Sequence, residues 1–317
     1  MTNRYRPEGY LFGTHENREY ISSRQGLEYA IREGKILEAT ALLCDSRMRL
    51  HVDLYGMTGI IDKSEALYSP TSSTIKDIAV ITRVGKPVCF KVMGFTYENG
   101  KEVAILSRRE AQKECLTAYL CDMMPGDIIE AKVTHLDSFG AFVDVGCGVV
   151  SLLSIDCISV SRISHPSDRL SVGDKIFTVI KSIDRDAGRI FVSMRELLGT
   201  WQENASAFEV GQTVAGIVRS IEPYGVFVEL APNLAGLAEL REGTDDEALT
   251  KVGERAAVYI KSILPDRMKI KLVLIDAYRG GASISPIKYF IDCEKTSHID
   301  KWIYSPPNAS KIIETVF

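Results

Sequence analysis

The sequence predicts a mainly β protein made of tandem five-stranded antiparallel barrels joined by short helices. Three observations support this fold class: one long segment recurs within the chain, apolar and polar residues alternate inside each copy, and the segments between copies have a helical composition. The chain has 317 residues, of which 45% are hydrophobic and 25% are charged. These proportions are typical of globular proteins, and the length suits two or three domains.

The clearest repeat aligns residues 125–155 with residues 210–240 at a constant offset of 85. Both copies continue with a Val-Gly start and two further apolar runs, SVGDKIFTVIKSIDRDAGRIFVSMRE and KVGERAAVYIKSILPDRMKIKLVLID, at an offset of 80. The intervening loop has therefore lost five residues, a change that loops tolerate and paired strands do not. A third, more diverged copy lies upstream, in GKILEATALLCDSRMRLHVDLYGMTGIID and RVGKPVCFKVMGFTYENGKEVAILSRRE.

Within each copy the apolar residues alternate with polar ones in runs of five to eight residues, bounded by Gly, Asp or Pro. This period is typical of half-buried antiparallel strands, and each copy has room for five of them in about 75 residues. Five short strands bury their apolar faces and lose their exposed edges when they close into a barrel. Each copy is therefore predicted to be a small barrel of the OB type.

Helices are predicted at residues 22–34, 108–122 and 196–208, which are rich in Ala, Leu, Glu and Gln. The first of these begins with an N-cap serine and ends on a C-cap glycine. The predicted organisation is an N-terminal tail and helix at 1–33, a degenerate repeat at 34–111, a linker helix at 112–124, a second repeat at 125–197, a linker helix at 198–208, a third repeat at 209–277 and a C-terminal tail subdomain at 278–317.

Charge and cysteine usage restrict the class of protein. The 38 Lys and Arg against 42 Asp and Glu give a net charge of −4, which excludes a strongly basic nucleic-acid wrapper. The seven cysteines form no Cys-x-x-Cys pair, which favours a reduced, intracellular protein. The five His show no zinc-ligand spacing, so no metal or other cofactor is expected. No signal sequence or long apolar run occurs, so we expect a cytoplasmic protein without membrane contact.

The middle copy resembles the tandem S-one RNA-binding domains of the small-subunit ribosomal protein S-one family. The resemblance rests on the blocks GDIIEAKV, SFGAFVDVG, SHPSDRLSVGD and DRDAGRIFVSM, in that order. It extends over about residues 34–277, and the tail ending in KIIETVF is similar to the end of the short bacterial members. It implies OB-fold barrels that bind single-stranded RNA such as mRNA, in association with small ribosomal subunit proteins. It also implies no catalysis and no small-molecule substrate.

Two aromatic residues, Phe139 and Phe142, flank Gly140 in the middle copy. Side chains three apart in a flat strand point to opposite faces, but a glycine at a bend or bulge re-aims the strand. Both rings would then stand on the outer barrel wall as a platform for stacked bases, which contribute about 1–3 kcal/mol each with little sequence preference. Tyr224 and Phe227 offer the same platform in the third copy. For both pairs the alternative is a place in the core.

The resemblance adds polar candidates in the middle copy. Asp184 and Arg189 match the family's Asp and Arg at the turn before the last strand, while the family's histidine position is occupied by Ser154. Lys132, on the first strand, is a candidate phosphate contact because of its position beside the platform. The alternative for all three charged residues is a solvated strand and turn surface.

The other two copies depart further from the family pattern. In the third copy Lys269 replaces the arginine, but Glu239 occupies the histidine position and would repel a phosphate, so weaker binding is expected. The first copy has Met48 and His51 at the platform positions and Arg49 in place of the glycine. It is expected to have lost the stacking surface and to serve as a docking module, as the resemblance implies.

Four further aromatic residues are interpreted as packing residues. Trp201 is predicted to pack between barrels, and Tyr289, Trp302 and Tyr304 in the tail to form or cap a small apolar cluster.

Three functions remain open from the sequence: RNA binding, protein docking and catalysis. The middle copy carries 8 basic and 10 acidic residues between positions 124 and 197, so RNA binding cannot rest mainly on phosphate neutralisation and should weaken only slightly with salt. A protein-docking scaffold with incidental RNA binding is the main alternative. An enzyme is the weakest alternative, since the sequence has no Gly-rich phosphate cradle, Gly-x-Ser-x-Gly elbow or acidic metal triad.

Overall fold

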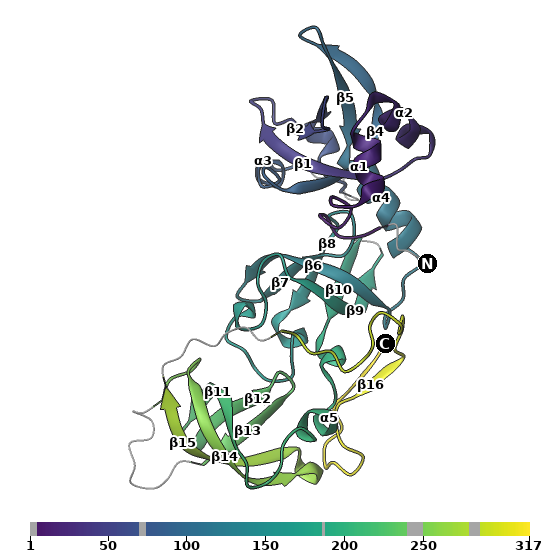
Figure 1. The fold of residues 1–317 in the computed structure, drawn as a ribbon. Coiled ribbons are helices and arrows are strands. Elements are labelled where there is room, and N and C mark those ends of the chain that lie inside the picture. Colours follow the sequence, from purple (N-terminus) through teal and green to yellow (C-terminus); the bar gives the residue numbers. More distant parts are fainter. Residues whose placement is uncertain (1–4, 70–73, 186–187, 240–249, 279–285) are drawn as a thin grey trace.

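Three closed barrels follow one another along the chain in the computed structural model (Figure 1). The structure describes residues 5–69, 74–185, 188–239, 250–278 and 286–317. Figure 1 shows the second barrel between the other two, with the C-terminal tail running back along the second and third barrels. The predicted fold class, tandem five-stranded barrels with few helices, is confirmed.

The strand bounds are as follows. The first barrel contains β1 (Leu37–Cys44), β2 (Leu50–Asp53), β3 (Thr58–Ile61), β4 (Pro87–Glu98) and β5 (Lys101–Ser107). The second contains β6 (Ile128–Asp137), β7 (Gly140–Asp144), β8 (Val150–Ser154), β9 (Lys175–Asp184) and β10 (Arg189–Ser193). The third contains β11 (Thr213–Glu222), β12 (Gly225–Ala231), β13 (Leu234–Ala238), β14 (Arg255–Leu264) and β15 (Lys269–Tyr278). The tail adds β16 (Lys301–Ile303) and β17 (Glu314–Val316).

Each barrel closes in the same way, through a parallel pairing of its third and fifth strands. In the second barrel this pairing sets Phe191 of β10 beside Leu152 of β8. Strands β6 and β11 start 85 residues apart, and β9 and β14 start 80 apart, so the sequence offsets correspond to equivalent strands. Each first strand also carries a bulge in its pairing with the second, at Leu42, Thr134 and Arg219. Such bulges help a short strand bend around a small barrel.

The helices are short, and the two that follow the first and second barrels lie at the barrel junctions. The helices are α1 (His15–Ile21), α2 (Arg24–Arg32), α3 (Asp77–Ile81), α4 (Arg108–Cys115), which continues as a π turn over Leu116–Leu120, and α5 (Trp201–Ala205). Single 3-10 turns occur at Lys63–Glu65, Ile155–Cys157, Pro166–Asp168, Arg195–Leu198 and Pro265–Arg267. The helix expected at 196–208 is interrupted at Gly199, whose φ of +83° ends the 3-10 turn before α5 begins.

One buried asparagine joins the second barrel to the third. Asn233, in the turn between β12 and β13, is 0% exposed. Its Oδ1 accepts from the Val160 N–H at 2.9 Å, and its Nδ2 donates to the carbonyls of Arg195 and Gly199, each at 2.8 Å. Its own carbonyl accepts from the Tyr304 hydroxyl at 2.7 Å. A single residue therefore ties together the second barrel, the linker, the third barrel and the tail.

The tail aromatics are packing residues, but they divide between two apolar clusters. Trp302 and Tyr304 are buried in the core of the third barrel together with Trp201, and their ring centroids lie 5.5 Å apart. Tyr289 instead contacts Phe177 on β9, where its hydroxyl accepts from the Phe177 N–H at 2.9 Å. The tail thus packs on both barrels because its aromatic residues divide between them.

The N-terminal segment crosses the junction between the first and second barrels (Figure 1). Glu8 is buried there and forms an ion pair with Arg108, with 2.7 Å between Oε1 and Nε. Its backbone N–H donates to Asp144 Oδ2 at 2.7 Å, and its carbonyl accepts from Lys132 Nζ at 2.8 Å. Burial alone would raise the pKa of Glu8, but the Arg108 guanidinium holds it below the usual value. Glu8 is therefore the ionised partner of Arg108.

Glu38 is a second buried carboxyl group at this junction, and no cation of the described residues forms an ion pair with it. It is 0% exposed, and its Oε2 accepts from the N–H groups of Gly9, Leu11 and Phe12 at 2.9–3.0 Å. Its Oε1 has no hydrogen-bond partner in the part of the chain that the structure describes. Burial, together with the negative charge of Glu8, raises the pKa of Glu38 to about 8.

This raised pKa predicts that the stability of the junction falls as the pH rises. Between about pH 4.5, the ordinary pKa, and about pH 8 the native state keeps the Glu38 proton that the unfolded chain has lost. We expect the urea midpoint of wild type to decrease from pH 5.5 to pH 8.5, and the decrease to be shallower in Glu38→Gln, which has no proton to lose. An identical pH slope in both proteins would show that Glu38 does not titrate in this window.

Candidate nucleic-acid interface

Two aromatic rings stand together on the outer wall of the second barrel. Phe139 lies in the two-residue turn between β6 and β7 and is 49% exposed, and Phe142 lies on β7 and is half-buried. Their ring centroids are 5.8 Å apart and the ring planes meet at 89°. Side chains alternate between the two faces along a strand, but Phe139 lies in the turn and not in β7. Both rings therefore share one face without a bend in β7.

Gly140 has a different role from the predicted bend. A Cβ at this position would lie 2.5 Å from the Leu153 carbonyl oxygen and 2.9 Å from the Ser154 Cα. The glycine therefore lets the start of β7 approach the backbone of β8 closely. The bulge is on the partner strand instead, at Thr134, whose hydroxyl donates to the Phe142 carbonyl at 3.0 Å.

A third ring lies on this face and was not predicted from the sequence. His135 follows the bulge, pairs with Phe142 across the ladder, and is exposed. Its ring stacks on that of Phe142, with centroids 6.0 Å apart and planes 25° from parallel. The hairpin register would have placed His135 opposite Phe142 once the turn was located at Ser138 and Phe139, so the signal was present in the sequence.

The apolar surface continues across the barrel from these rings. Phe142 pairs with Leu152 on β8, and Leu152 pairs with Phe191 on β10. Both side chains are partly exposed, whereas their neighbours along the strands, Leu153 and Val192, are buried in the core. We call the surface made of His135, Phe139, Phe142, Leu152 and Phe191 the aromatic face.

The predicted polar residues divide between two places. Arg189 and Asp184 are cross-strand partners at the end of the β9–β10 hairpin, and both are exposed. Arg189 lies two residues before Phe191 on β10, so it borders the aromatic face. Lys132 is elsewhere: its ammonium donates to the Glu8 carbonyl at the junction with the first barrel. The structure does not bring Lys132 to the aromatic rings.

The third barrel repeats the ring pair. Tyr224 lies in the turn before β12 and is 62% exposed, and its centroid is 6.2 Å from that of Phe227, with planes at 89°. Gly225 again permits a close approach, because a Cβ there would lie 2.6 Å from the Ala238 carbonyl oxygen. The residue that pairs with Phe227 is Ser220, so this barrel has no counterpart of His135.

The predicted charged positions of the third barrel are both on its surface. Lys269 is exposed at the start of β15. Glu239 forms an ion pair with Lys271, with 3.3 Å between Oε1 and Nζ, so its charge is partly compensated. The repulsion that we expected from Glu239 is correspondingly reduced.

Comparison with known families decides which family these barrels represent. The family model described as S1 RNA binding domain matches residues 122–195, which contain the second barrel and its aromatic face. Residues 122–195 are an S1 RNA-binding domain. This is the S-one family that the sequence blocks resemble.

Curated relatives extend the similarity beyond this S1 domain. The chain is 32% identical over 228 residues to small ribosomal subunit protein bS1 of Staphylococcus aureus (strain COL), covering 67% of this chain and 57% of that protein. It is 32% identical over 178 residues to bS1 of Leuconostoc lactis, covering 53% of this chain and 41% of that protein. The chain thus spans about half the length of the relatives that it matches.

One solved structure has a local likeness to the chain. The solution structure of GSP13 from Bacillus subtilis is 28% identical, over 23% of this chain and 57% of that chain, with a TM-score of 0.23. A TM-score this low carries no argument about fold or function.

The first barrel has a polar network where the S1 domain has its rings. Arg49 donates to Asp45 at 2.9 Å and to Glu98 at 2.6 Å, and His51 Nε2 lies 3.1 Å from Asp45 Oδ2. Met48 adopts a left-handed backbone, with φ of +60°, in the turn before β2. None of these positions presents an aromatic platform.

Metal sites and membrane-spanning helices are both absent from the described part of the chain. No group of three or more His, Cys, Asp or Glu side chains there is arranged to hold a metal ion. No helix in the same ranges is long and apolar enough to cross a membrane.

The close approach at Gly140 predicts a specific stability cost. We expect Gly140→Ala to lower the free energy of unfolding by about 1–3 kcal/mol, because its Cβ would press on the backbone of β8. The matched control is Gly13→Ala, whose Cβ meets nothing within 4 Å and should change stability by no more than about 0.5 kcal/mol. Urea unfolding of both variants measures the difference, and equal stabilities would contradict this role for Gly140.

Proposed function

We propose that this chain binds single-stranded RNA, including mRNA, by stacking bases on the rings of its second and third barrels, in association with the small ribosomal subunit. One observation carries the proposal. The perpendicular pairs Phe139–Phe142 and Tyr224–Phe227 recur at the same place on two barrels, outside both cores. Exposed aromatic pairs add nothing to barrel packing, and bases stack on such rings.

The geometry of each pair suits stacking. The turn residue is about half exposed or more, so part of its ring is open to a ligand. Because the two rings of a pair are perpendicular, they present surfaces in two directions, and successive bases of a single strand can use both. A duplex keeps its bases paired and stacked, so the proposal predicts a preference for single strands.

The electrostatics support stacking as the main source of affinity. The S1 domain is slightly acidic, and Arg189 is the cation that borders the aromatic face. Few phosphates would be neutralised, so the affinity should decrease only weakly with salt. A binding site of this kind accepts many sequences, which suits a protein that contacts different mRNAs.

The Asn233 junction supports joint use of the two faces. Its four hydrogen bonds hold the second and third barrels together. A strand bound to one face is therefore kept near the other, which raises its effective concentration there. Ribosomal association is proposed from the relatives named small ribosomal subunit protein bS1, and it implies a cytoplasmic location and a binding function without catalysis.

A protein-docking function is the second candidate, and it concerns the first barrel. That barrel has no aromatic platform, and it exposes apolar side chains, including Leu42, Ile78, Met93 and Tyr97. Exposed apolar patches are typical of interaction surfaces. Docking through the first barrel is compatible with RNA binding by the other two.

Removing the rings of the S1 domain is expected to weaken RNA binding. Fluorescence anisotropy with a labelled single-stranded RNA of about a dozen nucleotides should show a loss of at least tenfold in Phe139→Ala/Phe142→Ala, because stacking contributes about 1–3 kcal/mol per base. Tyr97→Ala, which removes a ring that is 73% exposed on the first barrel, is the matched control and should bind like wild type.

The outcomes separate the two candidate functions. Equal RNA binding by wild type and the double variant, or no binding by either, would overturn stacking and leave protein docking as the function to pursue. A salt dependence that indicates six or more neutralised phosphates would also contradict the proposed mechanism.

A further inference from the structure

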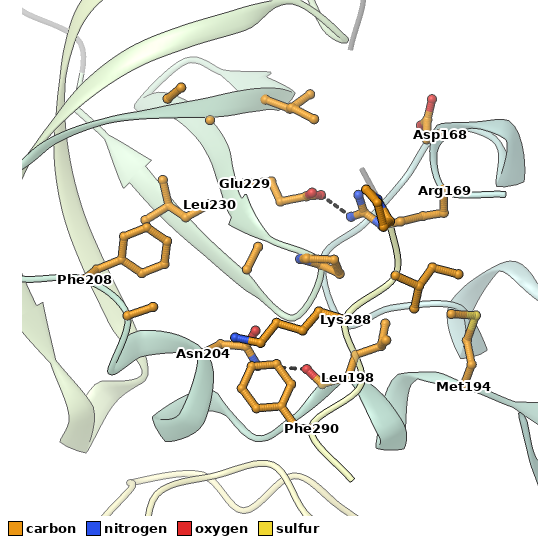
Figure 2. A pocket seen from close by; sticks show the side chains of 18 of the residues that line it. Asp168, Arg169, Met194, Leu198, Asn204, Phe208, Glu229, Leu230, Lys288 and Phe290 are labelled. Atoms are coloured by element: carbon orange, nitrogen blue, oxygen red, sulfur yellow. Dashed lines mark hydrogen bonds and ion pairs between the residues drawn. The ribbon is translucent and has the colours of Figure 1, made fainter. Parts of the chain in front are cut away.

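A cavity of about 440 Å³ lies between the second and third barrels and is closed on one side by the tail (Figure 2). The second barrel contributes Arg169, the linker contributes Asn204 and Phe208, strand β12 contributes Leu230, and the tail contributes Lys288 and Phe290. The volume falls within the range of about 300–1,000 Å³ that is typical of small-molecule sites. The cavity is separate from both ring pairs, since none of those four rings lines it.

One side of the cavity is apolar and partly aromatic. Figure 2 shows Phe208 and Leu230 together on one side and Phe290 below Lys288. Phe208 and Leu230 pack only partly against the core of the third barrel, so part of each remains available to a ligand. An aromatic wall of this kind favours a flat ring system as the occupant.

Asn204 presents an unused hydrogen-bond acceptor beside this wall. The residue is 3% exposed, and its Nδ2 donates to the carbonyls of Leu198 and Thr200, each at 2.9 Å. Both amide hydrogens are thereby engaged, whereas Oδ1 accepts no hydrogen bond from the described residues. This oxygen is not one of the buried atoms without a partner, so it is open to the cavity, and a ligand with an N–H or O–H donor can bind it.

The charges around the cavity favour an anion. Both carboxylates are already paired with arginines: Glu229 with Arg169 and with Arg219, and Asp168 with Arg219 at 3.2 Å. Lys288 is exposed at the rim, and its ammonium lies 4.8 Å from the Phe290 ring centroid without a carboxylate partner among the described residues. An ammonium in this setting is suited to a phosphate group.

We propose that this cavity binds one nucleotide, with the base against Phe208 and hydrogen-bonded to Asn204 Oδ1, and the phosphate at Lys288. Each RNA nucleotide has a base with a flat face and an N–H donor on its edge, and a phosphate group. It can therefore contact the Phe208 wall, Asn204 Oδ1 and Lys288 together. Inorganic phosphate would leave the apolar wall and Asn204 unused, and a purely apolar ligand would leave Lys288 and Asn204 unused. The nucleotide is either free or part of an RNA chain, and the test distinguishes these sources.

Calorimetric titration of the full chain with AMP and with UMP tests the proposal directly. The background is the variant that lacks all four platform rings, Phe139→Ala/Phe142→Ala/Tyr224→Ala/Phe227→Ala, so that stacking on the barrel walls does not contribute. In this background Lys288→Gln and Phe208→Leu should each weaken mononucleotide binding at least fivefold. Lys295→Gln, which removes an exposed lysine of the same tail, is the matched control and should leave binding unchanged. Inorganic phosphate should bind more weakly than either nucleotide.

Two further comparisons distinguish a free nucleotide from one in an RNA chain and define the results that would overturn the cavity proposal. If the nucleotide belongs to an RNA chain, Lys288→Gln also weakens binding of a single-stranded oligonucleotide to the protein with intact rings; if it is free, only mononucleotide binding changes. No mononucleotide binding by the ring-free background, or equal binding with and without Lys288 and Phe208, would overturn the cavity proposal. Those results leave stacking on the aromatic rings untouched, because that function is tested by the ring variants alone.

Discussion

Closure of each five-stranded sheet through a parallel pairing of its third and fifth strands is the constraint on which the rest of the structure depends. The strands are short, and an open sheet would leave unpaired backbone groups at its edges. Closure fixes one side of every strand toward the core and the other toward solvent. In the second barrel it places Leu153 and Val192 inside and Leu152 and Phe191 outside. The aromatic face follows from this constraint, because no strand can turn its outer rings inward.

The barrels are joined by buried polar contacts of two kinds. Charged groups hold the first junction, where Glu8 pairs with Arg108 and the uncompensated Glu38 keeps its proton to about pH 8. The second junction combines an uncharged amide, Asn233, with the buried ion pair between Arg169 and Glu229. Buried groups of either kind demand specific partners, so each junction favours one arrangement of its barrels.

The sequence was sufficient for the fold and for the four platform rings, because both depend on local pattern. Strand alternation, turn glycines and the 85-residue offset reveal the barrels without any knowledge of contacts. Contacts between distant residues were not accessible in this way. Lys132 bonds to Glu8, 124 residues away. The tail could not be assigned for the same reason, since its aromatic residues contact two barrels. His135, by contrast, was within reach of the sequence, because the hairpin register places it opposite Phe142.

The central claim is that the exposed rings of the second and third barrels are the surfaces on which RNA bases stack. Aromatic carbon–proton NMR spectra, recorded while a single-stranded oligonucleotide is titrated into the full chain, test it most directly. The account predicts upfield ring-current shifts for Phe139, Phe142, Tyr224 and Phe227, with no change for Phe90, which is fully buried in the first barrel. Shifts confined to other residues, or RNA binding without any change at these four rings, would contradict it.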